Sequence, residues 1–282
     1  MGIEIKKNRD RVSPTFANIN LLGVCNANCY FCLGKDICEE LKGKNQLDIH
    51  YTNWKNFPEF LKLCKENDIT KLYLTGQTAD GLQYKYLSEI ITYLKGLGFT
   101  VGVRSNGYLA EEKMQEINMM DDEIAYSVHT LDSDTNKKIM GRSDIPNWNK
   151  IIPESGDNVR ISIVLNRYNV NQMYTLFGYL STFPNVRYIQ VRRISTDIRV
   201  EELQEDIDLY EEWYETFKNT GMYKKSGEFF GADQYEVYGK EVNFWRTVET
   251  SANSFNYFTD GTVSDEYFII EGYLKNWDGI YD

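Results

Sequence analysis

The sequence has few histidines and no long apolar run, and these scarcities exclude several classes of protein. It contains two histidines and five cysteines in 282 residues. Its opening segment, MGIEIKKNRDRVSPTF, has no apolar stretch long enough for a signal peptide, and no later stretch approaches the length of a membrane span. The cysteine count is odd, and three cysteines fall within eight residues, which a secreted disulfide framework rarely shows. We therefore expect a cytoplasmic protein without a membrane partner, whose clustered thiols bind a metal.

The charge is unevenly distributed along the chain. The formal net charge is −11, but residues 201–282 carry 19 acidic and 6 basic side chains, a net charge of −13, and residues 1–200 have a net charge of +2. The acidity belongs to the C-terminal part, so the first 200 residues can still bind an anionic group locally. The sequence has no basic stripe interleaved with aromatics, and we do not expect nucleic acid as a partner.

Short apolar runs alternate with longer amphipathic segments over the first 195 residues, a pattern typical of βαβ units in a parallel sheet. The pattern predicts strands at 17–24, 71–75, 100–105, 123–129, 159–165 and 186–192. Helices are predicted between them at 54–66, 84–97, 110–118, 134–140 and 171–183. Because crossovers between parallel strands are right-handed, we expect an α/β fold, a partial (β/α)6 TIM-like barrel.

The pattern changes near residue 198. A charged helix at about 201–218 is followed by a stretch rich in Tyr, Phe and Gly, and then by a strand pair near 255–258 and 263–270. The segment TDGT at 259–262 suits the turn between this pair, because Asp-Gly tolerates positive φ angles. We predict a barrel at 1–197 and a C-terminal α+β extension at 198–282 that covers or flanks it.

Three cysteines form the most distinctive motif of the chain. Cys25, Cys29 and Cys32 follow the first predicted strand directly, so their thiols lie on a loop at the C-terminal end of the sheet. In parallel α/β folds, ligands bind at that end. A cubane cluster usually takes four thiolates, and a loop that offers three leaves one iron open for another ligand. The motif predicts a [4Fe–4S] cluster whose open iron is a reaction site.

Other uses of these thiols stay open on spacing alone. Structural zinc prefers paired CxxC motifs, and the sequence offers neither a second pair nor a nearby histidine. A cluster for electron transfer normally has a fourth ligand, which Cys38 is close enough in sequence to supply. The thiols can also be buried and unrelated. Their place after a strand and the repeated βα pattern favour the open cluster.

The motif CxxxCxΦC, with Phe31 before the last cysteine, resembles that of the radical S-adenosylmethionine (radical SAM) superfamily. The resemblance continues in order over about the first 195 residues. The segments KLYLTG (71–76), RSNG (104–107), YSVHTLDS (126–133) and ISIVLNRYN (161–169) are similar to the family's segments on strands two to five. Such proteins fold as a partial (β/α)6 barrel, in agreement with the predicted strands.

The resemblance implies that Cys25, Cys29 and Cys32 hold the cluster and that S-adenosylmethionine chelates its open iron. One electron, from a donor such as a flavodoxin or a ferredoxin, then yields methionine and a 5′-deoxyadenosyl radical, which takes hydrogen from the substrate. The residues implied for cofactor binding are Tyr30, Phe31, Gly76, Gln77, Thr78, Asn106, Ser127 and Asn166.

One of these segments departs from the family pattern. Where the family has Gly-Gly-Glu-Pro, this chain has Gly-Gln-Thr-Ala at 76–79 and loses the carboxylate. We expect an oxygen of Gln77 or Thr78 to accept from the cofactor's ammonium instead, or Asp80 to restore the charge. A plain turn without a chemical role is the alternative.

Three further residues are candidates for catalysis, namely Cys38, His129 and Arg192. Cys38 can donate a hydrogen atom to a product radical, although a passive thiol is the more ordinary role. For His129, at the end of the fourth strand, a ligand contact and a structural role are equally expected. Arg192, with Arg193 beside it, clamps a carboxylate or phosphate or else pairs with the acidic extension. Cys64 lies in a helical run and is expected in the core.

The chain has no cysteine after Cys64, so we do not expect the extension that binds auxiliary clusters in many peptide-modifying members of the family; a peptide enzyme would be of the simpler kind, such as an epimerase or a small maturase. We predict an enzyme that abstracts hydrogen from a peptide or a small biosynthetic intermediate. A nucleoside- or tRNA-modifying enzyme of the same family stays open as an alternative, and so does an iron–sulfur electron carrier or sensor without catalysis. The aromatic region 223–273 forms either a wall over the barrel mouth or hydrophobic filling.

Overall fold

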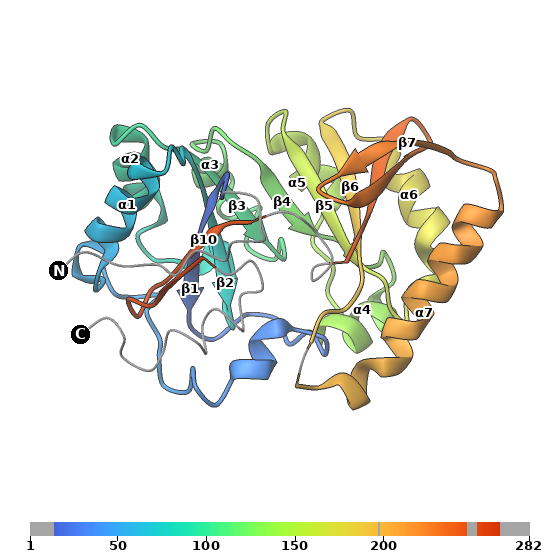
Figure 1. Ribbon diagram of the computed structural model, residues 1–282, viewed down its shortest axis with the longest axis horizontal. Coiled ribbons are helices and arrows are strands. Elements are labelled where there is room, and N and C mark those ends of the chain that lie inside the picture. The colour runs from blue at the N-terminus through green and yellow to red at the C-terminus, as the bar shows by residue number, and fades with distance from the viewer. Residues whose placement is uncertain (1–13, 197, 247–252, 266–282) are drawn as a thin grey trace.

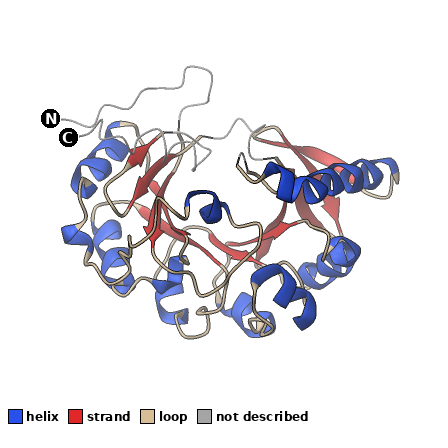
Figure 2. Cartoon of the chain, turned by 90° about the horizontal axis from the view of Figure 1, so that it is seen from below, coloured by secondary structure: helices blue, strands red, loops and turns tan. Residues whose placement is uncertain are grey.

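The computed structural model describes residues 14–196, 198–246 and 253–265. The six predicted barrel strands are confirmed, and they pair in parallel in chain order. They are β1 (Ala17–Leu22), β2 (Lys71–Gln77), β3 (Thr100–Ser105), β4 (Ile124–Ser127), β5 (Val159–Val164) and β6 (Val186–Arg192). Figure 2 shows the strands in an open arc with helices along its outer side. The fold is therefore α/β, a partial (β/α)6 TIM-like barrel with a C-terminal α+β extension.

Five of the six barrel helices in the described residues lie close to their predicted places, four of them with shorter bounds and α4 with one residue more. The six helices are α1 (Phe57–Glu66), α2 (Leu87–Gly96), α3 (Met114–Ile117), α4 (Ser133–Met140), α5 (Trp148–Glu154) and α6 (Met173–Ser181). Four short 3₁₀ helices, η1 (Leu33–Ile37), η2 (Tyr51–Asn53), η3 (Gly81–Gln83) and η4 (Val170–Gln172), lie in the connections. The sequence analysis missed α5, because this helix is seven residues long and contains Pro153, which weakens its periodicity.

The two faces of each barrel strand differ in chemistry. In β1, Ala17, Ile19 and Leu21 pack into the core with Phe57 and Phe60 of α1. The residues between them, Asn18 and Asn20, point to the opposite face, as the two-residue period of a strand requires. Parallel strands that are buried on both faces are usually apolar throughout, so this alternation marks a barrel with a polar interior.

The C-terminal extension adds strands to both edges of the barrel sheet. It contains α7 (Val200–Asn219), β7 (Lys224–Phe229), β8 (Ala232–Val237), β9 (Lys240–Trp245), β10 (Phe255–Phe258) and β11 (Val263–Ser264). Strand β9 pairs in parallel with β6, and β10 pairs in parallel with β1, so the eleven strands form one sheet (Figure 1). The extension therefore flanks the barrel at its two open edges, and the division at residue 197 stays a prediction.

The predicted turn at 259–262 is confirmed. Strands β10 and β11 are antiparallel, the Phe258 amide donates to the Thr262 carbonyl at 2.8 Å, and Gly261 has a φ of +99°. Of the second predicted strand, 263–270, the structure describes Val263–Ser264 as strand, and residues 266–270 lie outside the described part.

The sequence analysis missed β7, β8 and β9. Each of the two turns between them has two residues with positive φ, Phe230-Gly231 (48° and 81°) and Tyr238-Gly239 (49° and 76°). A glycine at the second position of such a turn is a hairpin signal that could have revealed the three strands. None of the helices in the described part of the chain combines the length and the apolar character needed to cross a membrane.

Candidate active site

A cavity of about 280 Å³ opens at the C-terminal ends of the barrel strands. The cysteine loop, which we define as residues 25–32, forms one wall of it through Cys29, Phe31 and Cys32. The opposite walls come from strand ends and include six predicted site residues: Gly76, Gln77, Asn106, Ser127, His129 and Arg192. The structure thus brings together predicted site residues from the cysteine loop and from the ends of four strands, β2, β3, β4 and β6, around one space.

Backbone hydrogen bonds from α4 hold the cysteine loop. The amides of Asn28 and Tyr30 donate to the carbonyls of Met140 (2.9 Å) and Ile139 (3.1 Å), two of the carbonyls that the last turn of a helix leaves without partners inside the helix. The Arg142 guanidinium donates to the Asn26 carbonyl at 2.8 Å. The loop is therefore anchored to the barrel.

The three thiols share a partly buried environment. Burial raises the pKa of Cys25 to about 11, and it also raises the pKa of Cys29 and Cys32. The charges of neighbouring thiolates add to the increase at Cys25 and Cys29. Mutual repulsion of this kind means that the three groups ionise together only when a bound cation compensates their charge.

The donor set consists of three thiols on one short loop, and cysteine thiolates are the usual ligands of iron–sulfur clusters. In the part of the chain that the structure describes, no three His, Cys, Asp or Glu side chains form a site for a single metal ion. Ligation of a cluster by Cys25, Cys29 and Cys32 stays a prediction, which the chemistry of these side chains fits.

The residues at the end of β2 and in the turn after it have two roles: some line the cavity, and others bind the neighbouring backbone. Gly76 and Gln77 line the cavity, and a Cβ atom on Gly76 would lie 2.0 Å from the Ala79 carbonyl oxygen, so only glycine fits there. Thr78 has a φ of 57°, and its hydroxyl donates to the Gly23 carbonyl at 2.7 Å. The Thr78 hydroxyl therefore ties this turn to the segment before the cysteine loop.

Asp80, the candidate for restoring the charge of the cofactor site, lies in the scaffold beside the cavity. The Asp80 carboxylate is buried and accepts hydrogen bonds from the Leu82 amide (2.9 Å), the Ser105 hydroxyl (2.9 Å) and the Asn106 amide (2.6 Å). Burial raises its pKa, and these three bonds act in the opposite direction. Asp80 connects the ends of β2 and β3 and is not among the described residues that line the cavity.

Asn106 and His129 are both held by hydrogen bonds at the cavity wall. The Asn106 amide nitrogen donates to Asn26 Oδ1 at 2.7 Å and lies 3.6 Å from Cys25 Sγ. His129 Nδ1 accepts from the Val164 amide at 3.1 Å, and burial lowers the pKa of the imidazole to about 4. His129 is therefore neutral at pH 7 and carries its proton on Nε2.

Four other candidates lie in different surroundings. Asn166 is buried, accepts from the Tyr168 amide at 3.0 Å, donates to the Val164 carbonyl at 2.8 Å, and is not among the described lining residues. Tyr30 is not among the described lining residues, and its ring packs against Phe31 and Tyr168, with centroids 5.2 Å and 5.6 Å apart. Cys38 is exposed, whereas Cys64 is buried in the core as predicted.

Sequence reasoning missed several residues that shape the site. Gly34 lines the cavity, and a Cβ atom there would lie 2.8 Å from the backbone nitrogen of Thr78. Asn169 donates to the His129 carbonyl at 2.9 Å. Arg199 contacts the cysteine loop from α7. The glycine beside the cysteine motif was a usable signal, but the contacts of Asn169 and Arg199 join segments far apart in sequence.

The model of the radical SAM superfamily matches residues 19–165, which include most of β1, the cysteine loop and strands β2 to β5. The chain belongs to the radical SAM superfamily. Members of this family use S-adenosylmethionine and a [4Fe–4S] cluster, so the chain is an enzyme of this class.

Two curated relatives belong to the same superfamily. An S-adenosylmethionine-dependent nucleotide dehydratase from Thermoplasmatales archaeon (strain ISO4-H5) is 29% identical over 117 residues, 41% of this chain and 38% of the relative. A GTP 3′,8-cyclase from Campylobacter fetus subsp. fetus (strain 82-40) is 25% identical over 189 residues, 64% of this chain and 54% of the relative. This chain thus spans between about a third and about half of their lengths.

The fold is similar to that of solved radical SAM enzymes. Streptococcus suis SuiB bound to the precursor peptide SuiA matches with a TM-score of 0.58 and 16% identity, over 92% of this chain and 61% of that chain. SuiB bound to S-adenosylmethionine matches with a TM-score of 0.59 and 14% identity, over 89% of this chain and 60% of that chain. At this identity the similarity establishes the barrel architecture.

Proposed function

We propose that Cys25, Cys29 and Cys32 bind a [4Fe–4S] cluster and that this enzyme abstracts a hydrogen atom from a peptide or a small biosynthetic intermediate. The observation that carries the proposal is the cysteine loop, whose partly buried thiols stand beside a cavity at the C-terminal ends of the strands. When bound, the cluster and S-adenosylmethionine supply a one-electron cleavage that gives methionine and a 5′-deoxyadenosyl radical. A flavodoxin or a ferredoxin provides the electron.

The cavity residues have distinct roles in this proposal. The backbone of Gly76 and the amide oxygen of Gln77 accept hydrogen bonds from the cofactor's ammonium. The Ser127 hydroxyl contacts its ribose or carboxylate, and the Phe31 ring lies against its adenine. Neutral His129 holds β4 and β5 together at the rim. The family resemblance and the position of these residues around one cavity support these roles.

The polar interior of the barrel supports a polar substrate. Below the rim, the cavity is lined by Asn18, Arg104, Arg160 and Ser162, whose side chains come from the inner faces of β1, β3 and β5. Arg192 contributes a further guanidinium at the rim. A side chain or small molecule with several hydrogen-bonding groups suits this polar lining.

A nucleotide is the second candidate substrate. The two curated relatives are named for chemistry on nucleotides, and arginine is well suited to phosphate. A peptide is compatible with the fold that the chain shares with SuiB, which was solved with its precursor peptide. Thermal unfolding of the cluster-loaded protein with each ribonucleoside triphosphate separates the two: a selective rise in Tm favours a nucleotide, and its absence with all four favours the peptide or another small intermediate.

The catalytic proposal is tested by anaerobic reconstitution with iron and sulfide, followed by dithionite and S-adenosylmethionine. We expect 5′-deoxyadenosine by liquid chromatography and mass spectrometry, and none from the Cys25→Ala, Cys29→Ala or Cys32→Ala variants. The Cys38→Ala variant is the matched control, because Cys38 is exposed and outside the described cavity lining. Loss of the cluster in Cys38→Ala would favour the electron carrier, and a wild-type protein that binds a cluster but forms no 5′-deoxyadenosine would refute the proposal.

A further inference from the structure

We propose that Arg199, at the start of α7, is a positioning residue that holds the cysteine loop in the geometry needed for the cluster. The inference rests on the proposed function, because it takes the three cysteines as the cluster ligands. Arg199 lies in the extension, about 170 residues after the loop, and the sequence analysis gave it no role.

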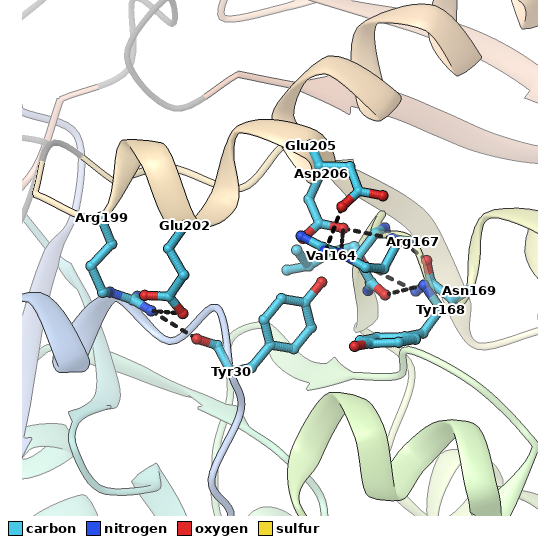
Figure 3. Close-up of polar contacts among 10 residues, drawn as sticks. Tyr30, Val164, Arg167, Tyr168, Asn169, Arg199, Glu202, Glu205 and Asp206 are labelled. Carbon is cyan, nitrogen blue, oxygen red and sulfur yellow. Dashed lines mark hydrogen bonds and ion pairs between the residues drawn. The ribbon is translucent and has the colours of Figure 1, made fainter.

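The Arg199 guanidinium makes three contacts, two with the cysteine loop and one with Asp36 just beyond it. Its Nη1 donates to the Tyr30 carbonyl and its Nη2 to the Cys32 carbonyl, both at 2.8 Å, and its Nε donates to Asp36 Oδ1 at 2.5 Å. Figure 3 shows the Arg199 side chain reaching from α7 to the backbone of Tyr30. One rigid group thus binds two backbone carbonyls of the cysteine loop and a carboxylate just beyond it.

Other residues fix the guanidinium in turn. The Asp36 side chain has no solvent exposure, and the Thr196 hydroxyl donates to its second oxygen at 2.6 Å. The Arg199 amide donates to Thr196 Oγ1 at 3.0 Å, and Glu202, one helical turn on, lies 3.6 Å from Nη1. The buried Asp36 carboxylate and the planar Arg199 guanidinium can form all of these bonds in only one arrangement. The bonds from Arg199 therefore hold the cysteine loop in one conformation.

The two carbonyls that Arg199 binds flank Phe31, which lines the cavity together with Cys32. Because the backbone is held at residues 30 and 32, the side chains of Phe31 and Cys32 keep a fixed direction. The loop is already tied to α4 at its middle through the amides of Asn28 and Tyr30. Arg199 supplies the corresponding constraint at its C-terminal end, where the third cysteine stands.

A second contact from α7 supports the same end of the loop. Asp206, seven residues after Arg199 and therefore on the same face of the helix, binds the Arg167 amide (2.7 Å) and its guanidinium (2.8 Å). The Tyr30 ring points toward Asp206 and packs against Tyr168, with ring centroids 5.6 Å apart (Figure 3). Helix α7 therefore docks against the cysteine loop and the loop after β5 together, so that the extension completes the site.

The test compares the Arg199→Gln and Arg199→Lys variants with Arg187→Gln, a matched control on the exposed side of β6. Three quantities are measured: the rate of iron release from the reconstituted protein to a chelator, the electron paramagnetic resonance spectrum of the reduced cluster with and without S-adenosylmethionine, and amide exchange of residues 28–36 in the cluster-free protein. The last measurement needs no cluster.

We expect Arg199→Gln to release iron about 10- to 100-fold faster, as is typical when a partner that orients metal ligands is lost. Its spectrum should change, and residues 28–36 should exchange faster. Arg199→Lys keeps the charge but not the planar fork, so we expect the same changes at a smaller size. If the glutamine variant does not fold, the lysine variant serves as the test. The control should behave as wild type.

Wild-type iron release, spectra and exchange in a folded Arg199→Lys or Arg199→Gln variant would overturn the inference. This result differs from a failure of the proposed function, in which the wild-type protein itself would hold no cluster or form no 5′-deoxyadenosine. If wild type and variants all hold a cluster equally well, the positioning role alone is refuted.

Discussion

The two faces of the barrel strands are made from alternate residues of the same segments, yet the two faces have different functions. On the outer face of β5, Ile161 and Ile163 are buried in the core shared with the helices. On its inner face, Arg160 and Ser162 line the cavity. The comparison teaches that the apolar outer face provides most of the stability of this barrel, which leaves the inner face available for polar chemistry.

The inner face itself has a closed floor and an open rim. At the floor, Arg160 Nε donates to Glu123 Oε1 at 2.7 Å, and the Tyr188 hydroxyl donates to Glu123 Oε2 at 2.7 Å. Arg160 also donates to Gln190 Oε1 at 2.6 Å. The floor is thus a satisfied ionic network, whereas the rim carries the proposed cofactor residues. Substitutions on the outer face, the floor and the rim should therefore affect different properties.

The largest effect should come from the floor. Replacing Glu123 with glutamine leaves the buried Arg160 without its counter-charge, and we expect a loss of about 4 kcal/mol of unfolding free energy at pH 7. Urea denaturation measures this difference. Glu228→Gln is the control, because Glu228 forms an exposed ion pair with Lys225 and should change stability by less than about 0.5 kcal/mol.

The same variant predicts a pH dependence with a definite sign. Burial alone would raise the pKa of Glu123, but the Arg160 charge and the Tyr188 hydrogen bond outweigh it and hold the pKa below its usual value of 4.5. The carboxylate therefore stabilises the fold above pH 4.5 and loses this contribution as the pH falls through the folded pKa. The gap between wild type and Glu123→Gln should shrink below pH 4.5, and a gap of constant size would contradict the ionic account of the floor.

The outer face should give the next largest effect. The Ile161→Ala variant removes buried methyl groups between the sheet and its helices, and we expect a loss of about 3 kcal/mol in urea denaturation. Ile198→Ala is the control, since Ile198 is 59% exposed and should change stability by less than about 0.5 kcal/mol. If Ile161→Ala were as mild as the control, stability would not reside mainly on the outer face.

Local patterns in the sequence were sufficient to predict the barrel. The predicted bounds of two strands, 100–105 and 186–192, agree with those of β3 and β6. Each of these short apolar runs lies between amphipathic segments, which define where the strand begins and ends. Strands β7 to β9 were missed because Lys224–Phe229 is mostly exposed and has no clear apolar alternation. Nothing local indicated that β9 and β10 would join opposite edges of one sheet, since that pairing depends on the whole fold.

The site was predictable where its residues belong to a motif of the family. Ser127, His129 and Asn106 lie in or beside the segments that resemble the family's strands, and all three line the cavity. Asn166, which the same resemblance implied, lies just past the end of β5 and bonds within its own loop. No local pattern could reveal the contact between Arg199 and Asp36, which are 163 residues apart in sequence.

The smallest effect on stability should come from the rim, where two serines near β4 offer a matched pair. Ser127 lines the cavity, whereas Ser155 is buried on the outer side and hydrogen-bonds the Tyr126 hydroxyl at 2.7 Å and the Ile151 carbonyl at 2.6 Å. We expect Ser155→Ala to cost about 1–3 kcal/mol, because it leaves a buried hydroxyl unpaired, and to leave the Kd for S-adenosylmethionine unchanged.

Ser127→Ala should change stability by less than about 0.5 kcal/mol and weaken cofactor binding by about three- to tenfold, the value of one hydrogen bond. Equilibrium dialysis of the cluster-loaded proteins measures the affinity. Wild-type affinity in Ser127→Ala would remove this serine from the cofactor site, and a large loss of stability there would show that the inner face also supports the fold.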